Sequence, residues 1–188
     1  MAYTRILLDT NTYLRLSKSI KPLLGKPFGK LQYALYLHKE IQLEIDRSNR
    51  IRTKFFWLEQ EEYKNERKKI LTTTKNEKNE IEIAYDYVWQ SQKDNAYNLS
   101  REDIYCIATA LILKIQLVTD DLNMIKTAKD FGVDILKTLE LIKLMIDSDF
   151  IDKSSLKEIV SYWIYIKDVP GNFKQDFKII FGESPPEL

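Results

Sequence analysis

The sequence predicts an α/β fold in which short parallel strands alternate with helices. Three brief apolar runs, residues 5–8, 115–118 and 133–136, are each followed by a turn or by the start of a helix. Strands buried on both faces of a parallel sheet have this unbroken apolar character. All five glycines and all five prolines lie outside residues 30–131, so we expect the middle of the chain to be rich in helix.

The remaining segments are assigned from their hydrophobic pattern. Residues 33–37 are a candidate fourth strand, whereas residues 40–45 fit either a strand or a helix. The highly charged segment 47–71 is predicted to be one long, exposed helix. Residues 147–188 are predicted to form two short helices and a tail.

The overall composition indicates a globular chain with one main domain. Of its 188 residues, 44% are hydrophobic and 30% are charged. Twenty-nine basic residues against 28 acidic ones leave a formal net charge of +1. This balance neither requires nor excludes a nucleic-acid partner, so any phosphate-binding surface must be a local patch.

Two residue types that occur only once restrict the chemistry. Cys106 is the only cysteine, which excludes an intramolecular disulfide and indicates a reducing compartment. His38 is the only histidine, which excludes mechanisms that need two histidines and most zinc sites. The N-terminus lacks a signal-peptide pattern, and the most apolar stretch, 104–118, is too short to span a bilayer. We therefore expect a cytoplasmic protein without membrane association.

Three aspartates are predicted to lie at the same edge of the sheet. Asp9 directly follows the first strand, and Asp121 follows the strand at 115–118. Ser100 and Asp103 form a capping-box pattern at the start of the helix that leads into that strand. The first turn of such a crossover helix lies where the strands end, which is also where open α/β sheets bind ligands.

Carboxylates brought together repel one another unless a cation neutralises them or some of them stay protonated. A site made only of oxygen ligands suits Mg²⁺ or Mn²⁺. Asp103 and Asp121 also have a local explanation, because aspartate is favoured where it caps a helix. Asp9 is harder to explain locally, since an acid that follows a buried strand is costly to desolvate without a partner.

The same residues resemble a known family. Residues 6–11, Ile-Leu-Leu-Asp-Thr-Asn, resemble the opening motif of PIN-domain nucleases, a strand that ends in aspartate with asparagine two residues later. Residues 103–111 are similar to the third acidic motif of that family, and residues 117–123 to its fourth, which contains Thr-x-Asp. The order and spacing of these motifs agree with the family over about residues 4–140.

The resemblance implies a three-layer α/β/α sandwich with a central, mainly parallel sheet of four or five strands. Residues 1–146 would form the nuclease domain, and residues 147–188 a C-terminal helical extension packed on it. It also implies a metal-dependent endoribonuclease that holds Mg²⁺ or Mn²⁺ with four acids. These acids are Asp9, Glu44, Asp103 and Asp121. Glu44 is the best match for the second acid of the family, and Glu40 is the alternative.

Other residues are expected to support this chemistry. Asn11 and Thr119 would support the acids, and Asp120 would either add charge or face solvent, of which we favour the second. A run of basic residues followed by aromatic ones suits single-stranded RNA, although a solvated helix face explains it equally well. The basic residues are Arg47, Arg50, Arg52 and Lys54.

The expected partners follow from the same resemblance. PIN nucleases are frequently toxins of toxin–antitoxin pairs, so an RNA substrate, an antitoxin protein and a homodimer are the expectations. One alternative is a non-catalytic PIN-like scaffold or binding module. A second is a phosphatase of the haloacid dehalogenase type, from which the chain departs because Asn11 stands where that family has its second aspartate.

Overall fold

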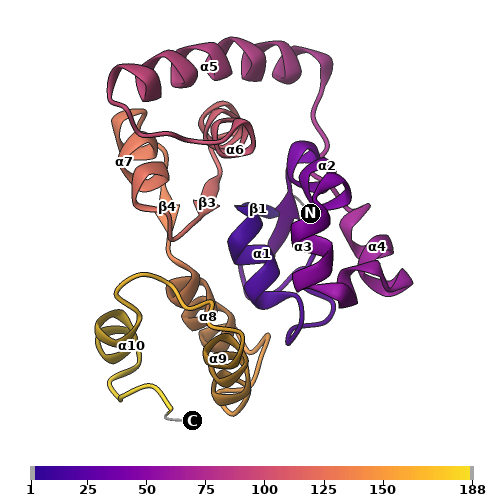
Figure 1. Ribbon diagram of the computed structural model, residues 1–188, viewed down its shortest axis with the longest axis vertical. Helices are drawn as coiled ribbons and strands as arrows, with labels where there is room; N and C mark the ends of the chain where they lie inside the picture. Colours follow the sequence, from indigo (N-terminus) through magenta and orange to yellow (C-terminus); the bar gives the residue numbers. More distant parts are fainter. Residues whose placement is uncertain (1–2, 187–188) are drawn as a thin grey trace.

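A four-stranded, entirely parallel sheet lies at the centre of the computed structural model, which describes residues 3–186 (Figure 1). The strand order is β2-β1-β3-β4. The strands are β1 (Thr4–Leu8), β2 (Tyr33–Leu37), β3 (Gln116–Val118) and β4 (Ile135–Leu136). The α/β class and the parallel strands predicted from the sequence are thereby confirmed.

The strands follow the apolar runs closely. Ile6, Leu7 and Leu8 of the central strand are fully buried, as expected for a strand covered on both faces. The predicted strand at 133–136 is shorter than expected, because only its last two residues form β4 at the edge of the sheet. Residues 40–45, which fit either structure, are helical.

Helices cover both faces of the sheet. Right-handed crossovers place α1 on one face and α6 and α7 on the other, because β2 and β3 flank β1 on opposite sides. Figure 1 agrees, with α5 and α6 on one side of the strands and α1 and α8 on the other. The helices are α1 (Thr10–Leu16), α2 (Lys39–Arg47), α3 (Asn49–Lys54), the 3₁₀ helix η1 (Phe56–Glu59), α4 (Glu61–Arg67), α5 (Lys75–Asp94), α6 (Arg101–Leu113), α7 (Leu122–Asp130), α8 (Thr138–Asp147), α9 (Ser155–Tyr165) and α10 (Phe173–Phe181).

The prediction of one long, exposed helix over 47–71 is wrong. The segment is divided among the end of α2, α3, η1 and α4, and Ser48 starts α3 by accepting a hydrogen bond from the backbone N–H of Ile51. Trp57 and Tyr63 are buried in the core. Their spacing does not follow one face of a single helix, so the chain must turn for both of them to be buried.

The C-terminal helices pack against the first helix of the chain. The indole N–H of Trp163 in α9, which is fully buried, donates a 2.9 Å hydrogen bond to the backbone carbonyl of Arg15 in α1. Lys137, just before α8, pairs with Asp176 of α10 at 2.7 Å. Within residues 3–186, no helix combines the length and the apolar character needed to cross a membrane.

Candidate functional site

The strand order creates a crevice at the carboxyl ends of β1 and β3. The chain leaves these neighbouring strands toward opposite sides of the sheet, and ligands of open α/β sheets bind at such a switch point. The two strands are joined there by a 3.1 Å hydrogen bond from the backbone N–H of Asp9 to the carbonyl of Val118. Asp9 and the segment 119–121 therefore meet at this crevice.

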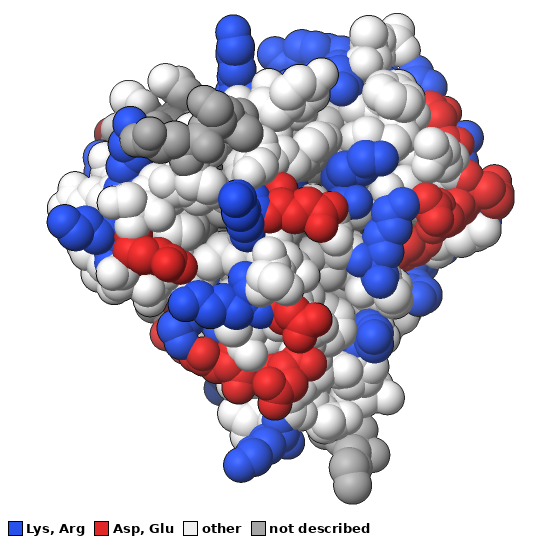
Figure 2. Space-filling model, turned by 90° about the horizontal axis from the view of Figure 1, so that it is seen from below, with Lys and Arg blue, Asp and Glu red and all other residues white. Residues whose placement is uncertain are grey.

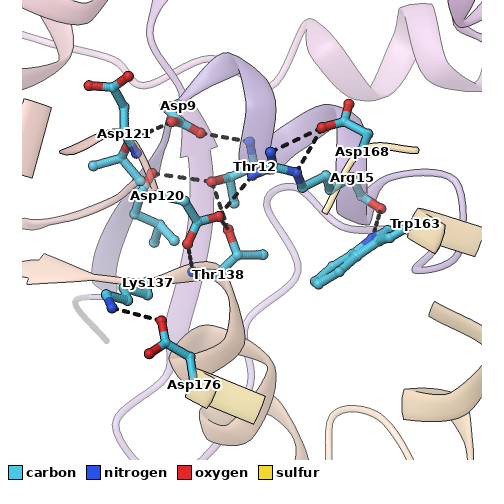
Figure 3. Close-up of polar contacts among 12 residues, drawn as sticks. Asp9, Thr12, Arg15, Asp120, Asp121, Lys137, Thr138, Trp163, Asp168 and Asp176 are labelled. Atoms are coloured by element: carbon cyan, nitrogen blue, oxygen red, sulfur yellow. Dashed lines mark hydrogen bonds and ion pairs between the residues drawn. The ribbon is translucent and has the colours of Figure 1, made fainter. Parts of the chain in front are cut away.

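Asp9 is buried and held from two sides. Its carboxylate oxygens accept hydrogen bonds from the backbone N–H of Thr12 and from the hydroxyl of Thr119, each at 2.6 Å (Figure 3). The side chain thus caps α1, and the residue is only 3% exposed. The pKa of Asp9 is raised to about 6, chiefly by burial and to a small extent by the charge of Asp120, while the hydrogen bonds from Thr119 and Thr12 oppose the shift.

Glu44 and Asp103 line one cavity of about 500 Å³ beside this edge. Glu44 accepts a 2.6 Å hydrogen bond from the Thr10 hydroxyl. Asp103 accepts one of 2.9 Å from the backbone N–H of Ser100, which confirms the predicted capping box. Burial raises the pKa of both carboxyl groups, and the negative charges of Glu102 and Asp103, in that order, raise that of Glu44.

Asp121 completes the set of four acids predicted from the sequence. It is exposed and caps α7, accepting hydrogen bonds from the backbone N–H groups of Asn123 and Met124 at 2.8 Å each. Its negative charge raises the pKa of Asp103, so these two side chains lie within electrostatic reach of each other. Both helix-capping roles considered as local explanations for Asp103 and Asp121 are therefore present.

The buried Cys106 thiol lies next to the acidic edge, the part of the sheet edge where Asp9, Glu44, Asp103 and Asp121 lie. Burial raises its pKa well above the usual value, and the charges of Asp103, Asp9 and Glu44 raise it further, in that order. The carboxyl groups of these three acids are therefore within electrostatic range of the thiol. Among the residues that the structure describes, however, no three acidic, histidine or cysteine side chains are close enough together to hold one metal ion.

The four basic residues predicted to bind nucleic acid do not share one surface. Arg50 and Lys54 line the cavity with Glu44, as does Asn11. Arg52 lines a different cavity and donates to the side chain of Asn49. Arg47 is exposed on α2 and lines neither cavity. Only Arg50 and Lys54 can meet a phosphate group beside the acids.

Asp120 does not face solvent, contrary to the interpretation favoured from the sequence. Its side chain is 9% exposed and pairs with Arg15 at 2.8 Å. It also accepts hydrogen bonds from the backbone N–H and the hydroxyl of Thr138 (Figure 3). The sequence gives no sign of these partners, because Arg15 lies 105 residues away.

Two residues that contribute to the site, Thr10 and Asp168, are not predicted from the sequence. Thr10, which holds Glu44, follows Asp9 directly and was detectable as a hydroxyl beside the first acid. Asp168 lines the same cavity and accepts hydrogen bonds from Arg15 at 3.0 and 3.3 Å and from Lys54 at 3.3 Å. No local pattern predicts that pair, because 153 residues separate Arg15 from Asp168.

His38 caps the helix that carries Glu44, and this contact should make folding sensitive to acid. Its Nδ1 accepts a 3.2 Å hydrogen bond from the backbone N–H of Glu40, and its ring stacks on Tyr105. Burial, with a smaller effect from the charge of Lys39, lowers its pKa from 6.5 to about 4. Protonation would turn the acceptor into a donor and break the cap.

The neutral imidazole therefore stabilises the fold fully above pH 6.5, and this contribution is lost as the pH falls from 6.5 toward 4. We expect the wild type to lose up to about 3 kcal/mol more than the His38→Asn variant over that range, measured by urea unfolding. Asparagine keeps an acceptor for the cap but does not titrate. Equal acid sensitivity of both proteins would contradict the role of His38.

Two comparisons with known proteins find no match. No protein-family model matches the chain, and no curated protein matches its sequence. The function is therefore inferred from the acids at this edge of the sheet and from the sequence motifs that contain them.

Proposed function

We propose that this protein is a Mg²⁺- or Mn²⁺-dependent nuclease of the PIN type that hydrolyses phosphodiester bonds of RNA. The observation that carries the proposal is the gathering of acids from four separate elements at the switch point of the sheet. Glu44 and Asp103 line one cavity, and Asp9 and Asp121 follow the neighbouring strands β1 and β3. The order of the motifs along the chain supports the same family.

The donor set fits a hard divalent cation, because it consists of carboxylate oxygens that repel one another. Asp9, Glu44, Asp103 and Asp121 would hold the ion. A bound ion supplies a water molecule of lowered pKa and stabilises charge on the phosphate. The hydroxyl of Thr119 orients Asp9 by a hydrogen bond at 2.6 Å, the same distance at which the Thr10 hydroxyl orients Glu44.

Substrate binding would depend on two cations in the cavity and on one exposed aromatic side chain outside its lining. Arg50 and Lys54 line the cavity and can attract phosphate groups. Phe56 is 71% exposed just after α3 and can stack on an unpaired base, whereas its neighbours Phe55 and Trp57 are buried. This combination favours single-stranded RNA. An antitoxin partner, a homodimer and a cytoplasmic location remain part of the proposal.

The test is cleavage of end-labelled single-stranded RNA and DNA with Mn²⁺, Mg²⁺ or EDTA. The wild type should cleave RNA only when metal is present, and Asp103→Asn should be inactive. Asp130→Asn is the matched control, because Asp130 is exposed at the far end of α7. Intact RNA with folded wild-type protein under every condition would refute the proposal.

A matched pair of variants in α2 identifies the second acid. Glu44→Gln should lower the cleavage rate by more than about 100-fold, because loss of a metal ligand should cost more than the 10–100-fold caused by loss of a group that only orients one. Glu40→Gln should leave the rate within about twofold. The reason is that Glu40 lines a different cavity and pairs with Arg101 at 3.6 Å. The initial rates of RNA cleavage decide between them, and the reverse order of effects would assign the role to Glu40.

A non-catalytic scaffold is the second candidate, and one observation favours it. Asp9, Asp103 and Asp121 each cap a helix or complete its capping box, so each has a structural role without a metal. Calorimetric titration with Mn²⁺ separates the two candidates. Binding that is lost in Asp103→Asn supports the nuclease, and the absence of binding by the wild type supports the scaffold.

A further inference from the structure

The side chains that line a groove beside α10 carry an unbalanced positive charge. It encloses about 900 Å³ between the end of α9, α10 and residues 184–186. Its apolar lining comes from Ile164, Val169, Phe173, Pro185 and Pro186. The charged side chains that line it are all lysines: Lys167, Lys174 and Lys178.

The acids of segment 167–186 are paired with basic residues from elsewhere in the chain. Asp168 pairs with Arg15 and Lys54, and Asp176 pairs with Lys137. Glu183 lies 3.7 Å from Lys153. The acids of this segment are therefore engaged outside the groove.

The lysines of the same segment have no counter-charge among residues 3–186. Lys167, Lys174 and Lys178 are exposed, and none forms an ion pair with a residue that the structure describes. Lys174 and Lys178 are four residues apart on α10, where like charges destabilise a helix. Figure 2 shows the molecule from the end where α8, α9 and α10 lie, and acidic side chains occur among the basic ones over that face. The excess of positive charge is therefore a property of the groove.

We propose that this groove binds an acidic peptide segment of a partner protein, with at least one apolar side chain inserted between the lysines. Carboxylates of the peptide would neutralise Lys167, Lys174 and Lys178, and its apolar side chain would lie against Val169, which is 39% exposed. A nucleic acid fits less well, because the aromatic ring in the lining, Phe173, is 7% exposed and offers no free face for a base.

The groove adjoins the acidic edge through one loop. Lys167 and Val169 line the groove, whereas Asp168 between them lines the cavity that contains Glu44 and Asp103. A bound peptide would therefore contact the loop on both sides of Asp168. Binding itself does not depend on the proposed nuclease activity, so the two proposals can fail separately.

The test is selection of random 12-residue peptides on the full-length protein, followed by titration of a selected, fluorescein-labelled peptide by fluorescence anisotropy. We expect enrichment of peptides that combine aspartate or glutamate with apolar residues. The double variant Lys174→Glu/Lys178→Glu should weaken binding by at least tenfold. Lys126→Glu/Lys129→Glu, which changes two exposed lysines of α7, should leave it unchanged.

Three outcomes would overturn the proposal. The first is the failure of any peptide to be enriched, or the enrichment of neutral or basic ones. The second is equal binding of the selected peptide by the wild type and by Lys174→Glu/Lys178→Glu. The third is displacement of the peptide by a 12-nucleotide oligouridylate at comparable concentration, which would assign the groove to nucleic acid.

Discussion

Replacing Asp9 with asparagine should abolish metal-dependent cleavage of RNA and leave the protein at least as stable as the wild type. Asparagine has the same shape and retains an acceptor for the backbone N–H of Thr12, but it removes a negative charge that is 3% exposed. Removing a partner that merely orients a metal ligand costs 10–100-fold, so losing the ligand itself should lower the rate by more than about 100-fold. Initial cleavage rates and thermal unfolding measure the two effects.

The cleavage rate and the stability of Asp9→Asn, measured together, distinguish a functional acid from a structural one. If Asp9 served only to cap α1, asparagine would preserve the cap and the activity. If the variant lost both its activity and its fold, the loss of activity would say nothing about catalysis. Asp9→Asn with a normal melting temperature and a normal cleavage rate would remove Asp9 from the proposed site.

Replacing Arg15 with methionine should destabilise the protein by about 3 kcal/mol. Arg15 is 8% exposed and pairs with Asp120 at 2.8 Å and with Asp168 at 3.0 Å. Removing one member of a buried ion pair leaves the other charge without compensation, which costs more than the pair itself contributes. Urea unfolding at pH 7 measures the change in the free energy of unfolding.

The control is Lys143→Met, which removes an exposed pair with Asp147 one turn further along α8. That change should cost less than about 0.5 kcal/mol, because exposed pairs contribute little. The double variant Arg15→Met/Asp168→Asn should recover part of the loss, since one of the two carboxylates that lose their contact with Arg15 is then neutral. Strict additivity of the two changes would show that Arg15 does not stabilise the protein through Asp168.

The strands could be predicted because their signal is local. Ile6, Leu7 and Leu8 form an unbroken apolar run, and a strand buried on both faces needs nothing else. The capping box at Ser100 and Asp103 is local as well, and both of its hydrogen bonds are present. The parallel arrangement of the strands, and the edge of the sheet at which the acids lie, could be predicted from the same local patterns.

The path of residues 47–71 could not be predicted, because it depends on contacts with distant parts of the chain. No glycine or proline marks the breaks between α3, η1 and α4. Trp57 turns inward and its indole N–H contacts the hydroxyl of Tyr162 in α9 at 3.2 Å, across 105 residues. The charged composition of this segment suggests an exposed helix, but the packing of Trp57 against α9 determines the path of the chain instead.

The candidate site was only partly predictable for a related reason. The sequence identifies Asp9, Asp103 and Asp121 as acids at one edge, but local patterns cannot separate a capping aspartate from a metal ligand. The structure shows the capping contacts of all three and places Asp103 in one cavity with Glu44. The contribution of Asp168 could be found only in three dimensions.

The hydrogen bond between Asp9 and Thr119 has a consequence for the timing of protein synthesis. The two residues are 110 positions apart, and β1 remains without its β3 neighbour until residue 118 is available. At roughly 5–20 residues per second, a ribosome needs about 5–20 seconds to cover that interval. The ion pair between Arg15 and Asp168 can form only later still, when Asp168 has been synthesised. The acidic edge is therefore incomplete on the growing chain until Asp121, the last of its four acids, has been synthesised.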